Sequence, residues 1–336
     1  MNREEIIQAF VCLGEDIRNN LLSEDYQNMY HRAQAQNGWF IPMNIQRSLE
    51  EFLPWLDRKT LEDFSSRYAF AKEPKTIAVV AAGNIPAVCF HDVLCVLLSG
   101  HKLMLKLSSS DNVIIPFLFS RLKETFSLPI EFVDKIANFD AVIATGSNSS
   151  AMYFETYFGK YPHIIRKSRS SIAVVEKEED ISGIEDDILL YMGLGCRNVS
   201  LVFLPNGFSL DALKQRLSLY SHLTDHNKYR NNYDYHKAIF LMNLIPFTDA
   251  CPMLLQEKRE LHAPVSVLYY TYYDTRKEVV DFISQHQEEL QCVVSNNFDF
   301  SDCSLVSDKI LYGDSQKPSI DTFADNVDTM VFLSEL

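Results

Sequence analysis

From Lys75 onward the chain alternates short β-rich apolar runs with amphipathic helical patterns, and this alternation limits its possible folds more than any other feature. Repeated strand, helix, strand units with short connections specify a parallel sheet covered by helices on both faces. The strands and helices expected in this first series are 76–81, 86–98, 102–107, 113–125 and 140–145, with Asp111 as the cap of the second helix. The series predicts a doubly wound α/β domain of the nucleotide-binding type.

A second series follows, and a chain of 336 residues is long enough for two domains. Its expected strands are 171–175, 199–204, 238–242, 265–272 and 292–295, with helices at 184–194 and 210–220. Before both series, Ile6, Phe10, Leu13 and Ile17 recur every three or four residues, which predicts helices over the first 70 residues. The predicted segments are 1–70 (helical), 71–165 (dinucleotide-binding), 166–315 (thiol-bearing) and 316–336 (C-terminal).

Charge and cysteine content exclude several classes of protein. With 31 basic and 45 acidic side chains the net charge is −14, which disfavours nucleic-acid binding. The longest apolar region, Ile77–Ser99, is interrupted by polar residues and proline and does not predict a membrane span, and the charged start does not resemble a secretory signal, so we expect a cytoplasmic protein. Seven cysteines from Cys12 to Cys303, with no close pair, predict neither a disulfide framework nor a metal site.

The strongest local motif is Gly193-Leu-Gly-Cys196-Arg-Asn198, which joins an expected helix to an expected strand. Two glycines permit positive φ angles, so the thiol of Cys196 can face a cleft while its backbone N–H points at a bound oxygen. Cys196 is thus a candidate nucleophile. The alternative is a small core residue beside a glycine that ends a helix, and the spacing alone does not decide between them.

Two further turns follow expected strands. Asn84 lies in Ala82-Gly-Asn-Ile-Pro86, at the carboxyl end of the first strand, where its amide can donate to a developing oxyanion. A plain turn with Pro86 in the first helical turn is the alternative and is favoured by the local pattern alone. Gly146-Ser147 opens a helix whose free N–H groups suit a pyrophosphate, although no GxGxxG occurs and a simple helix cap explains the same letters.

These turns, in this order, resemble the aldehyde dehydrogenase superfamily, and most closely its acyl-CoA reductases related to the bacterial luminescence fatty-acid reductase. The resemblance runs from about residue 70 to the C-terminus. The matching segments are 82–86, His91-Asp92, Gly100-His101, 106–111, 144–147, 193–198 and 325–330. The resemblance implies an α/β, aldehyde dehydrogenase-like fold of two doubly wound domains behind a helical leader. It also implies oligomerisation through a C-terminal strand, for which 329–333 is the candidate, so we expect a homodimer.

The resemblance also implies roles for individual residues. Cys196 takes the position of the catalytic thiol, and Asn84 that of the amide that forms the oxyanion hole with the cysteine N–H. Lys106 falls where a lysine contacts the adenosine ribose, and Gly146 with Ser147 where the pyrophosphate-binding helix opens. Glu260, followed by Pro264-Val265, takes the position of the glutamate that bonds the nicotinamide ribose. Without that Pro-Val context, a solvated acid would be the better interpretation of Glu260.

Two departures from the family pattern refine the predicted reaction. The stretch 163–171 carries no acid where hydrolytic aldehyde dehydrogenases place their general base, which suits transfer of the acyl group to or from CoA instead of to water. Ser109 stands where NAD-selective relatives carry a glutamate, and Ser108 and Ser109 can hydrogen-bond a 2′-phosphate. This favours NADPH, with NAD as the other possibility.

We therefore expect an NADPH-dependent reductase that converts an acyl-CoA, with a fatty acyl group as the first choice, to the aldehyde through a thioacyl-cysteine intermediate. A protein partner that supplies activated acyl groups would fit the resemblance. Two alternatives stay open. One is a cysteine-dependent acyltransferase or thioesterase without hydride transfer, and the other is a non-catalytic nucleotide-binding protein.

Overall fold

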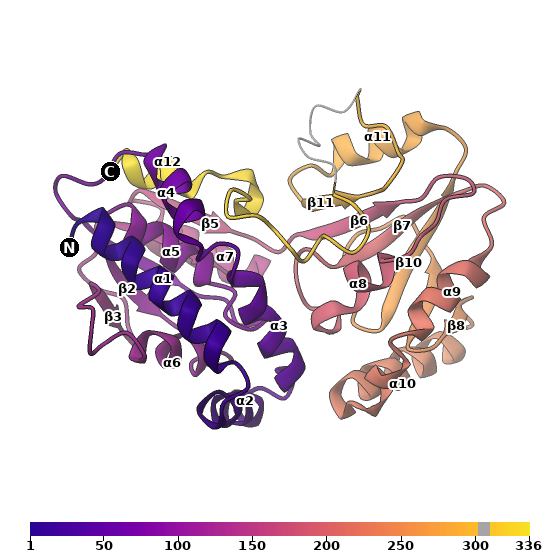
Figure 1. The fold of residues 1–336 in the computed structure, drawn as a ribbon. Helices are drawn as coiled ribbons and strands as arrows, with labels where there is room; N and C mark the ends of the chain where they lie inside the picture. The colour runs from indigo at the N-terminus through magenta and orange to yellow at the C-terminus, as the bar shows by residue number, and fades with distance from the viewer. Residues whose placement is uncertain (302–309) are drawn as a thin grey trace. The chain divides into compact units, whose positions relative to one another are not determined.

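The computed structural model describes residues 1–301 and 310–336, so Cys303 lies outside the described residues. The chain divides into two compact units, which are treated separately below. The first unit comprises Met1–Ser168 and Ser319–Leu336, and the second comprises Arg169–Pro318 (Figure 1). Within the described ranges, no helix has the length and apolar character needed to cross a membrane.

The N-terminal region is helical, as its periodicity predicts. Its helices are α1 (Arg3–Asn20), α2 (Glu24–Gln36), α3 (Pro42–Phe52) and α4 (Arg58–Ser66). Asn2 and Glu5 form a capping box that starts α1, which satisfies two N–H groups left free at the helix end. Phe10, Leu13 and Ile17 on α1 are fully buried in the same apolar core as the first sheet, so the helical leader and the sheet stabilise one another.

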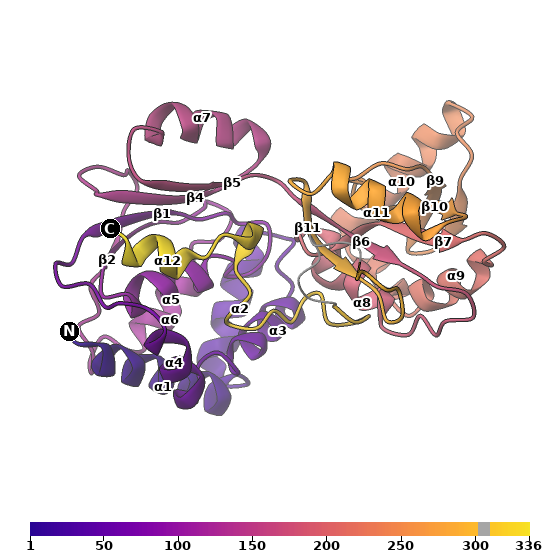
Figure 2. The same cartoon turned by 90° about the horizontal axis from the view of Figure 1, so that it is seen from above.

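The first sheet is fully parallel, and its strand order is β3-β2-β1-β4-β5. The strands are β1 (Thr76–Val80), β2 (Lys102–Lys106), β3 (Ile130–Phe132), β4 (Ala141–Thr145) and β5 (His163–Arg166). The connecting helices are α5 (Phe90–Leu98), α6 (Ile114–Ser120) and α7 (Asn148–Phe158). Figure 2 shows α7 on one face and α5 and α6 on the other. From β1 the chain adds β2 and β3 on one side, and then β4 and β5 on the other side. Ligands of doubly wound sheets bind beside the point where this order of strands reverses, here between β1 and β4.

The C-terminal segment returns to the first unit, but as a helix and not as the predicted strand. After a short 3₁₀ turn, η3 (Ala324–Asn326), helix α12 (Thr329–Ser334) packs on α5. Asp328 caps α12 by accepting the Val331 N–H at 2.9 Å, and Met330 and Leu333, three residues apart, are buried. The cap and this helical spacing favour a helix, although the apolar run by itself is also compatible with a strand. The expected dimer contact through a strand at 329–333 therefore loses its basis.

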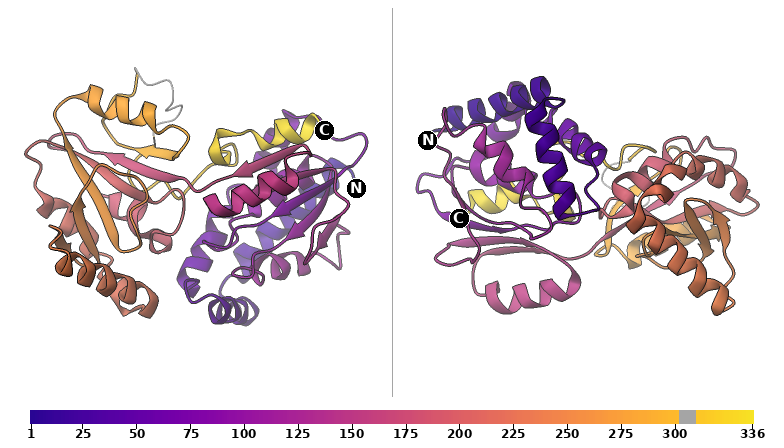
Figure 3. Two further views of the ribbon diagram at one scale, coloured as in Figure 1. Left: turned by 180° about the vertical axis from the view of Figure 1, so that it is seen from behind. Right: turned by 90° about the horizontal axis from the view of Figure 1, so that it is seen from below.

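The second unit, seen from two further directions in Figure 3, contains a mixed sheet. Its strand order is β11-β6-β7-β10-β9-β8, and only β8 is antiparallel to its neighbour among the described strands. The strands are β6 (Ser170–Val174), β7 (Val199–Pro205), β8 (Thr248–Ala250), β9 (Met253–Glu257), β10 (Val267–Tyr273) and β11 (Leu290–Val294). The helices are α8 (Ile184–Leu189), η1 (Leu190–Gly193), α9 (Leu210–Ser218), η2 (Ser221–Asp225), α10 (Asn227–Met242) and α11 (Arg276–Gln285).

Four other expected elements differ from the structure. The helix predicted at 113–125 corresponds to α6 and ends at Ser120. The strand predicted at 238–242 is the last part of α10, which His226 caps by accepting the Tyr229 N–H. The helix predicted at 86–98 begins only at Phe90, because Ala87 has a φ of +53° and interrupts it. The helix predicted at 184–194 ends early, since Tyr191 and Met192 also have positive φ angles.

Candidate functional site

Three turns of the first unit begin at the same edge of its sheet. They follow β1, β2 and β4, which are adjacent, and Val80 is paired with both Lys106 and Ala144. The turns therefore start at one level, at the carboxyl ends of the strands and beside the reversal in strand order. This is where parallel α/β sheets bind ligands. The edge carries Asn84, Lys106, Ser108, Ser109, Gly146 and Ser147, all of which the sequence singled out.

The turn that carries Asn84 packs directly against the next turn. A Cβ atom added to Gly83 would lie 2.5 Å from the Ser108 Oγ and 2.7 Å from the Ser108 Cβ, so only glycine fits. Asn84 itself is exposed at the tip. Asp111 accepts the Ala87 N–H at 2.6 Å, which fixes the end of this turn.

Asp111 is a buried carboxyl group, 4% exposed, between the two turns. Burial raises the pKa of Asp111 to about 7, although the N–H groups of Ala87 and Ile114 lower it in part. The N-cap of α6 is Val113, and no side chain caps the helix, so the prediction of Asp111 as the cap is wrong. The Asp111 carboxyl group is instead bonded to the Asn84 turn. With this pKa, the Asp111 carboxyl group gains or loses its proton near neutral pH.

The serine turn, defined as Ser108–Ser110, follows Lys106 at the end of β2. The Ser108 Oγ accepts the Ser110 N–H at 3.2 Å, and Ser109 is exposed. Lys106 is half-buried. A lysine and a group of hydroxyl groups at one sheet edge can bind sugar hydroxyls or a phosphate.

Gly146 and Ser147 connect β4 to α7. Ser147 is the N-cap of α7 and accepts the Ser150 N–H at 3.2 Å, so the helix-cap interpretation is correct for its side chain. A Cβ atom on Gly146 would lie 2.8 Å from the Ser150 Cβ and 3.0 Å from a ring carbon of Phe154. Gly146 thus lets the start of α7 approach β4 closely. The N–H groups at this helix start face the same edge as the other two turns, and they suit an anion.

In the second unit, Cys196 lies in a turn between η1 and β7. The turn is held by Asn198, a buried residue whose Oδ1 accepts the Gly195 N–H at 2.8 Å. Its Nδ2 donates to the carbonyl oxygens that end the preceding helix, those of Asp187, Ile188 and Leu190, at 3.2, 3.3 and 2.9 Å. Gly193 has a φ of +74°, as the motif predicts. Cys196 is half-buried, and its thiol is not part of a disulfide.

A serine at the start of β6 contacts both Cys196 and a second cysteine. Ser171 Oγ donates to the Cys196 carbonyl oxygen at 2.9 Å and lies 3.0 Å from the Cys292 Sγ. Burial raises the pKa of Cys292 to about 11, so this thiol stays protonated at neutral pH. Cys196 is the more accessible of the two thiols. Since Ser171 is paired with Val199, the Cys196 turn lies at the amino ends of β6 and β7.

Glu260 lies in the loop that leaves the carboxyl end of β9 and returns to the amino end of β10. It is exposed and pairs with Lys258 at 2.7 Å. The structure thus groups six predicted site residues at one edge of the first sheet and holds Cys196 and Glu260 on separate loops of the second unit. Sequence reasoning missed Asn198, which it quoted within a motif without giving it a role.

Three basic residues, Arg166, Lys167 and Arg169, lie where β5 ends and β6 begins. Arg166 is buried, and its guanidinium donates to Asp92 Oδ2 at 2.7 Å and to Thr329 Oγ1 at 3.0 Å. Burial removes Arg166 from contact with a soluble phosphate. For residues 1–301 and 310–336, no cluster of three or more His, Cys, Asp or Glu side chains is arranged to hold a metal ion.

Comparison with known proteins gives a family and a fold. The family model of acyl-CoA reductase (LuxC) matches residues 16–221. Aldehyde dehydrogenase from Bacillus cereus, solved as an NAD+ complex, has a TM-score of 0.65 and 11% identity over 93% of this chain and 76% of that chain. The Mycobacterium tuberculosis aldehyde dehydrogenase complexed with NAD+ has a TM-score of 0.67 and 11% identity over 92% and 76%.

Aldehyde dehydrogenase 21 from Physcomitrella patens, in complex with the reaction product succinate, has a TM-score of 0.72 and 12% identity, and the match covers 100% of this chain and 84% of that one. A search of curated protein sequences finds no match. At these identities the structural likeness concerns the fold alone. The predicted aldehyde dehydrogenase-like α/β fold is confirmed.

Proposed function

This chain belongs to the acyl-CoA reductase (LuxC) family and is an aldehyde-forming oxidoreductase, and we propose that it reduces a fatty acyl-CoA thioester to the aldehyde with NADPH. One observation carries the proposal beyond the family. The thiol of Cys196 is half-buried on a turn whose backbone is fastened by the buried Asn198 side chain. A nucleophile fixed in this way attacks without first having to be ordered.

The edge of the first sheet fits a dinucleotide. Gly83 and Gly146 each occupy a position where a Cβ atom would collide with a neighbouring turn or helix, and such close backbone approach is typical of phosphate-binding turns. In the proposal, Gly146 and Ser147 hold the pyrophosphate at the start of α7. Lys106, Ser108 and Ser109 hold the adenosine ribose and its 2′-phosphate.

The remaining contact assigned to the dinucleotide is Glu260, which would accept hydrogen bonds from the nicotinamide ribose. When bound, the nicotinamide supplies the hydride. Two of the similar structures are NAD+ complexes, which supports a nicotinamide nucleotide as the ligand class and leaves NADH as the alternative reductant. The absence of a carboxylate from the serine turn favours the phosphorylated form.

The proposed reaction begins at Cys196. Its thiolate attacks the thioester carbonyl, a new carbon–sulfur bond forms, and the CoA thiolate leaves and takes up a proton from water. The Cys196 N–H and the Asn84 amide are the proposed donors to the oxyanion. Hydride addition to the thioacyl carbon then gives a thiohemiacetal, which collapses to the aldehyde and restores the thiolate.

Hydrolysis of the thioacyl enzyme would require a base that activates water. The stretch that ends β5 and begins β6, residues 163–171, contains no carboxylate, and Arg166 within it is tied to Asp92. The thioacyl group therefore survives until hydride arrives. This favours the reductase over the thioesterase, in which water would be the acceptor.

The test has two stages. Full-length protein is incubated with radiolabelled acyl-CoA of several chain lengths, first without and then with NADPH, while labelled protein, free CoA, aldehyde and NADPH oxidation are measured. We expect stoichiometric labelling without NADPH, and turnover to aldehyde with it. Cys196→Ala should abolish both, whereas Cys251→Ala, which removes an exposed free cysteine, should abolish neither.

Three outcomes would contradict the proposal. Full activity of Cys196→Ala would exclude the thiol as nucleophile. Acyl-CoA cleavage at full rate without any dinucleotide would identify an acyltransferase or thioesterase. No labelling with any acyl-CoA would favour a non-catalytic nucleotide-binding protein, or an acyl donor delivered only by a protein partner, which acyl-carrier substrates would then reveal.

A further inference from the structure

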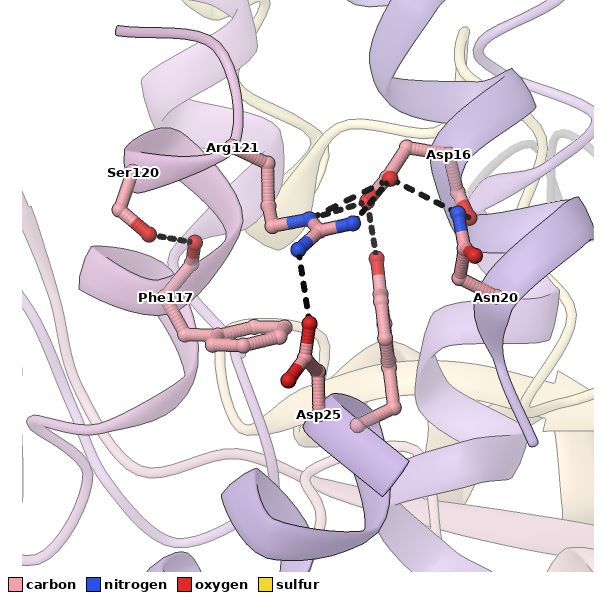
Figure 4. Close-up of polar contacts among 7 residues, drawn as sticks. Asp16, Asn20, Asp25, Phe117, Ser120 and Arg121 are labelled. Atoms are coloured by element: carbon pink, nitrogen blue, oxygen red, sulfur yellow. Dashed lines mark hydrogen bonds and ion pairs between the residues drawn. The ribbon is translucent and has the colours of Figure 1, made fainter. Parts of the chain in front are cut away.

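Helix α2 of the N-terminal region is fastened at its start to the elements beside the serine turn. Asp25 accepts a hydrogen bond at 3.2 Å from Arg121, the C-cap residue of α6, and Arg121 also pairs with Asp16 of α1 at 2.8 Å (Figure 4). Tyr26 donates its phenolic hydrogen to the same Asp16 carboxylate at 2.8 Å. These contacts fix where α2 runs along α6.

The other end of α2 reaches the serine turn itself. Gln36 Nε2 donates to the Ser109 carbonyl oxygen at 2.7 Å, and Asn37 Nδ2 donates to the Ser110 carbonyl oxygen at 3.3 Å. The two donors and the two acceptors are 73 residues apart in sequence. Because Asn37 Oδ1 also accepts the Trp39 N–H at 3.1 Å, its amide orientation is set on both sides.

These two bonds determine which way the peptide groups of the serine turn face. The carbonyl oxygens of Ser109 and Ser110 are directed to α2, while the N–H groups of the same peptides, on Ser110 and Asp111, bond to the Ser108 Oγ and O at 3.2 and 3.1 Å. A hydroxyl group that accepts a hydrogen bond keeps its own hydrogen for donation. The turn is thereby held with the Ser108 O–H as a donor and two carbonyl dipoles turned away.

We propose that Gln36 and Asn37 are positioning residues that hold the serine turn in the form that accepts the 2′-phosphate of the dinucleotide. The inference rests on the proposed function, since it concerns the adenosine end of that same site. Without the two side-chain donors, the carbonyl oxygens of the exposed turn can rotate toward the ligand, where they repel a phosphate. The N-terminal helices would thus contribute to the choice between NADPH and NADH, in addition to packing in the apolar core.

The test uses Gln36→Met, which keeps the side-chain length and removes the donor. Gln46→Met is the matched control, because Gln46 lies on α3 and donates to Glu50 of the same helix at 2.8 Å. Dissociation constants for adenosine 2′,5′-bisphosphate and for 5′-AMP are measured by calorimetry on the full chain. Tryptophan fluorescence during thermal unfolding checks that each variant is folded.

We expect Gln36→Met to weaken binding of the bisphosphate by about 5-fold and of 5′-AMP by less than about 2-fold, the loss typical of one hydrogen bond that acts at the 2′ position. In turnover assays the KM for NADPH should rise by a similar factor while kcat is unchanged. Gln46→Met should change none of these. Equal weakening of both nucleotides, or no weakening, would overturn the inference and leave the proposed function standing. If the wild-type protein binds neither nucleotide nor NADPH, the proposed function fails and the inference with it.

Discussion

The dinucleotide candidates of the first unit and the thiol of the second lie at opposite ends of the strands of their own sheets. In the first unit three turns at the carboxyl ends of β1, β2 and β4 contribute small, polar residues, and two glycines there leave no room for a Cβ atom. In the second unit a single turn at the amino end of β7 presents one thiol, and one asparagine holds it. A long, flexible ligand needs several contacts along one edge. A nucleophile needs one atom fixed in place.

If the first unit binds the dinucleotide and the second supplies the nucleophile, a substitution in the first unit should weaken dinucleotide binding without slowing acylation of Cys196. Gly146→Val places atoms where Ser150 and Phe154 already lie and pushes the start of α7 away from β4. We expect dinucleotide binding to weaken by at least about 100-fold, while labelling of Cys196 by acyl-CoA in the absence of dinucleotide keeps its rate. Equilibrium binding and single-turnover labelling measure the two quantities. Thr156→Ala, an exposed change toward the other end of the same helix, is the control.

Asn84 is the exception to this separation of functions, because it belongs to the first unit but is proposed to act in acylation. Loss of one oxyanion donor costs on the order of 3 kcal/mol in the transition state, so Asn84→Ala should slow acylation by about 100-fold. Binding of NADPH should change little. If acylation keeps its rate, Asn84 is the plain turn residue that local pattern alone suggests, and the thiol chemistry belongs wholly to the second unit.

A smaller effect is expected where the Cys196 turn is fastened. Asn198→Ala removes the acceptor of the Gly195 N–H and the donor to three carbonyl oxygens, which costs about 1–3 kcal/mol of stability for the groups left unpaired. The loosened turn should acylate about 10-fold more slowly and bind NADPH normally. Asn232→Ala, on the surface of α10, is the matched control. Unchanged acylation would show that Asn198 stabilises the fold alone.

Much of this arrangement could be predicted from sequence because the parallel strands are short apolar runs followed by turns rich in glycine, asparagine or serine. The strands expected at 76–81, 102–107 and 140–145 correspond to β1, β2 and β4 with ends that differ by one residue. Correct strands in a doubly wound order bring the turns that follow them to one edge. Gly193 likewise has the positive φ that its motif predicts.

The two predicted strands that are helices in the structure share a physical cause. An apolar run of five residues, such as 238–242 or 329–333, is too short for its period to distinguish strand from helix. Whether it is helical depends on caps at its start, His226 in one case and Asp328 in the other. Gln36 could not be found at all, because nothing in its neighbourhood marks it and its partner lies 73 residues away.

Each unit also contains a buried aspartate beside its candidate turn, and these two groups differ in how fully they are hydrogen-bonded. Asp187 accepts the Gly313 N–H at Oδ2 and the Ser315 N–H at Oδ1, and burial raises the pKa of Asp187 to about 6. Asp111 leaves Oδ1 buried without a partner, and its pKa rises further, to about 7. The better-bonded carboxylate keeps more of its charge.

This difference predicts an effect on stability alone, a pH dependence of the unfolding of the first unit. The pKa of Asp111 is about 7 in the folded chain and near 4 in the unfolded one, so the folded state binds the proton more tightly. Its stabilising contribution is therefore complete below about pH 4 and is lost as the pH rises from there through 7, a change on the order of 4 kcal/mol. Asp111→Asn, which keeps an oxygen for the Ala87 N–H, should remove that slope.

Both tryptophans of the chain, Trp39 and Trp55, belong to the first unit, so their fluorescence in urea reports the unfolding of that unit by itself. The free energy of unfolding of the wild type should fall between pH 5 and pH 8 relative to that of Asp111→Asn. Asp187→Asn, in the second unit, should leave the wild-type slope in this signal. Equal slopes for wild type and Asp111→Asn would show that Asp111 is ionised throughout, and that the Asn84 turn is then held by a charged carboxylate.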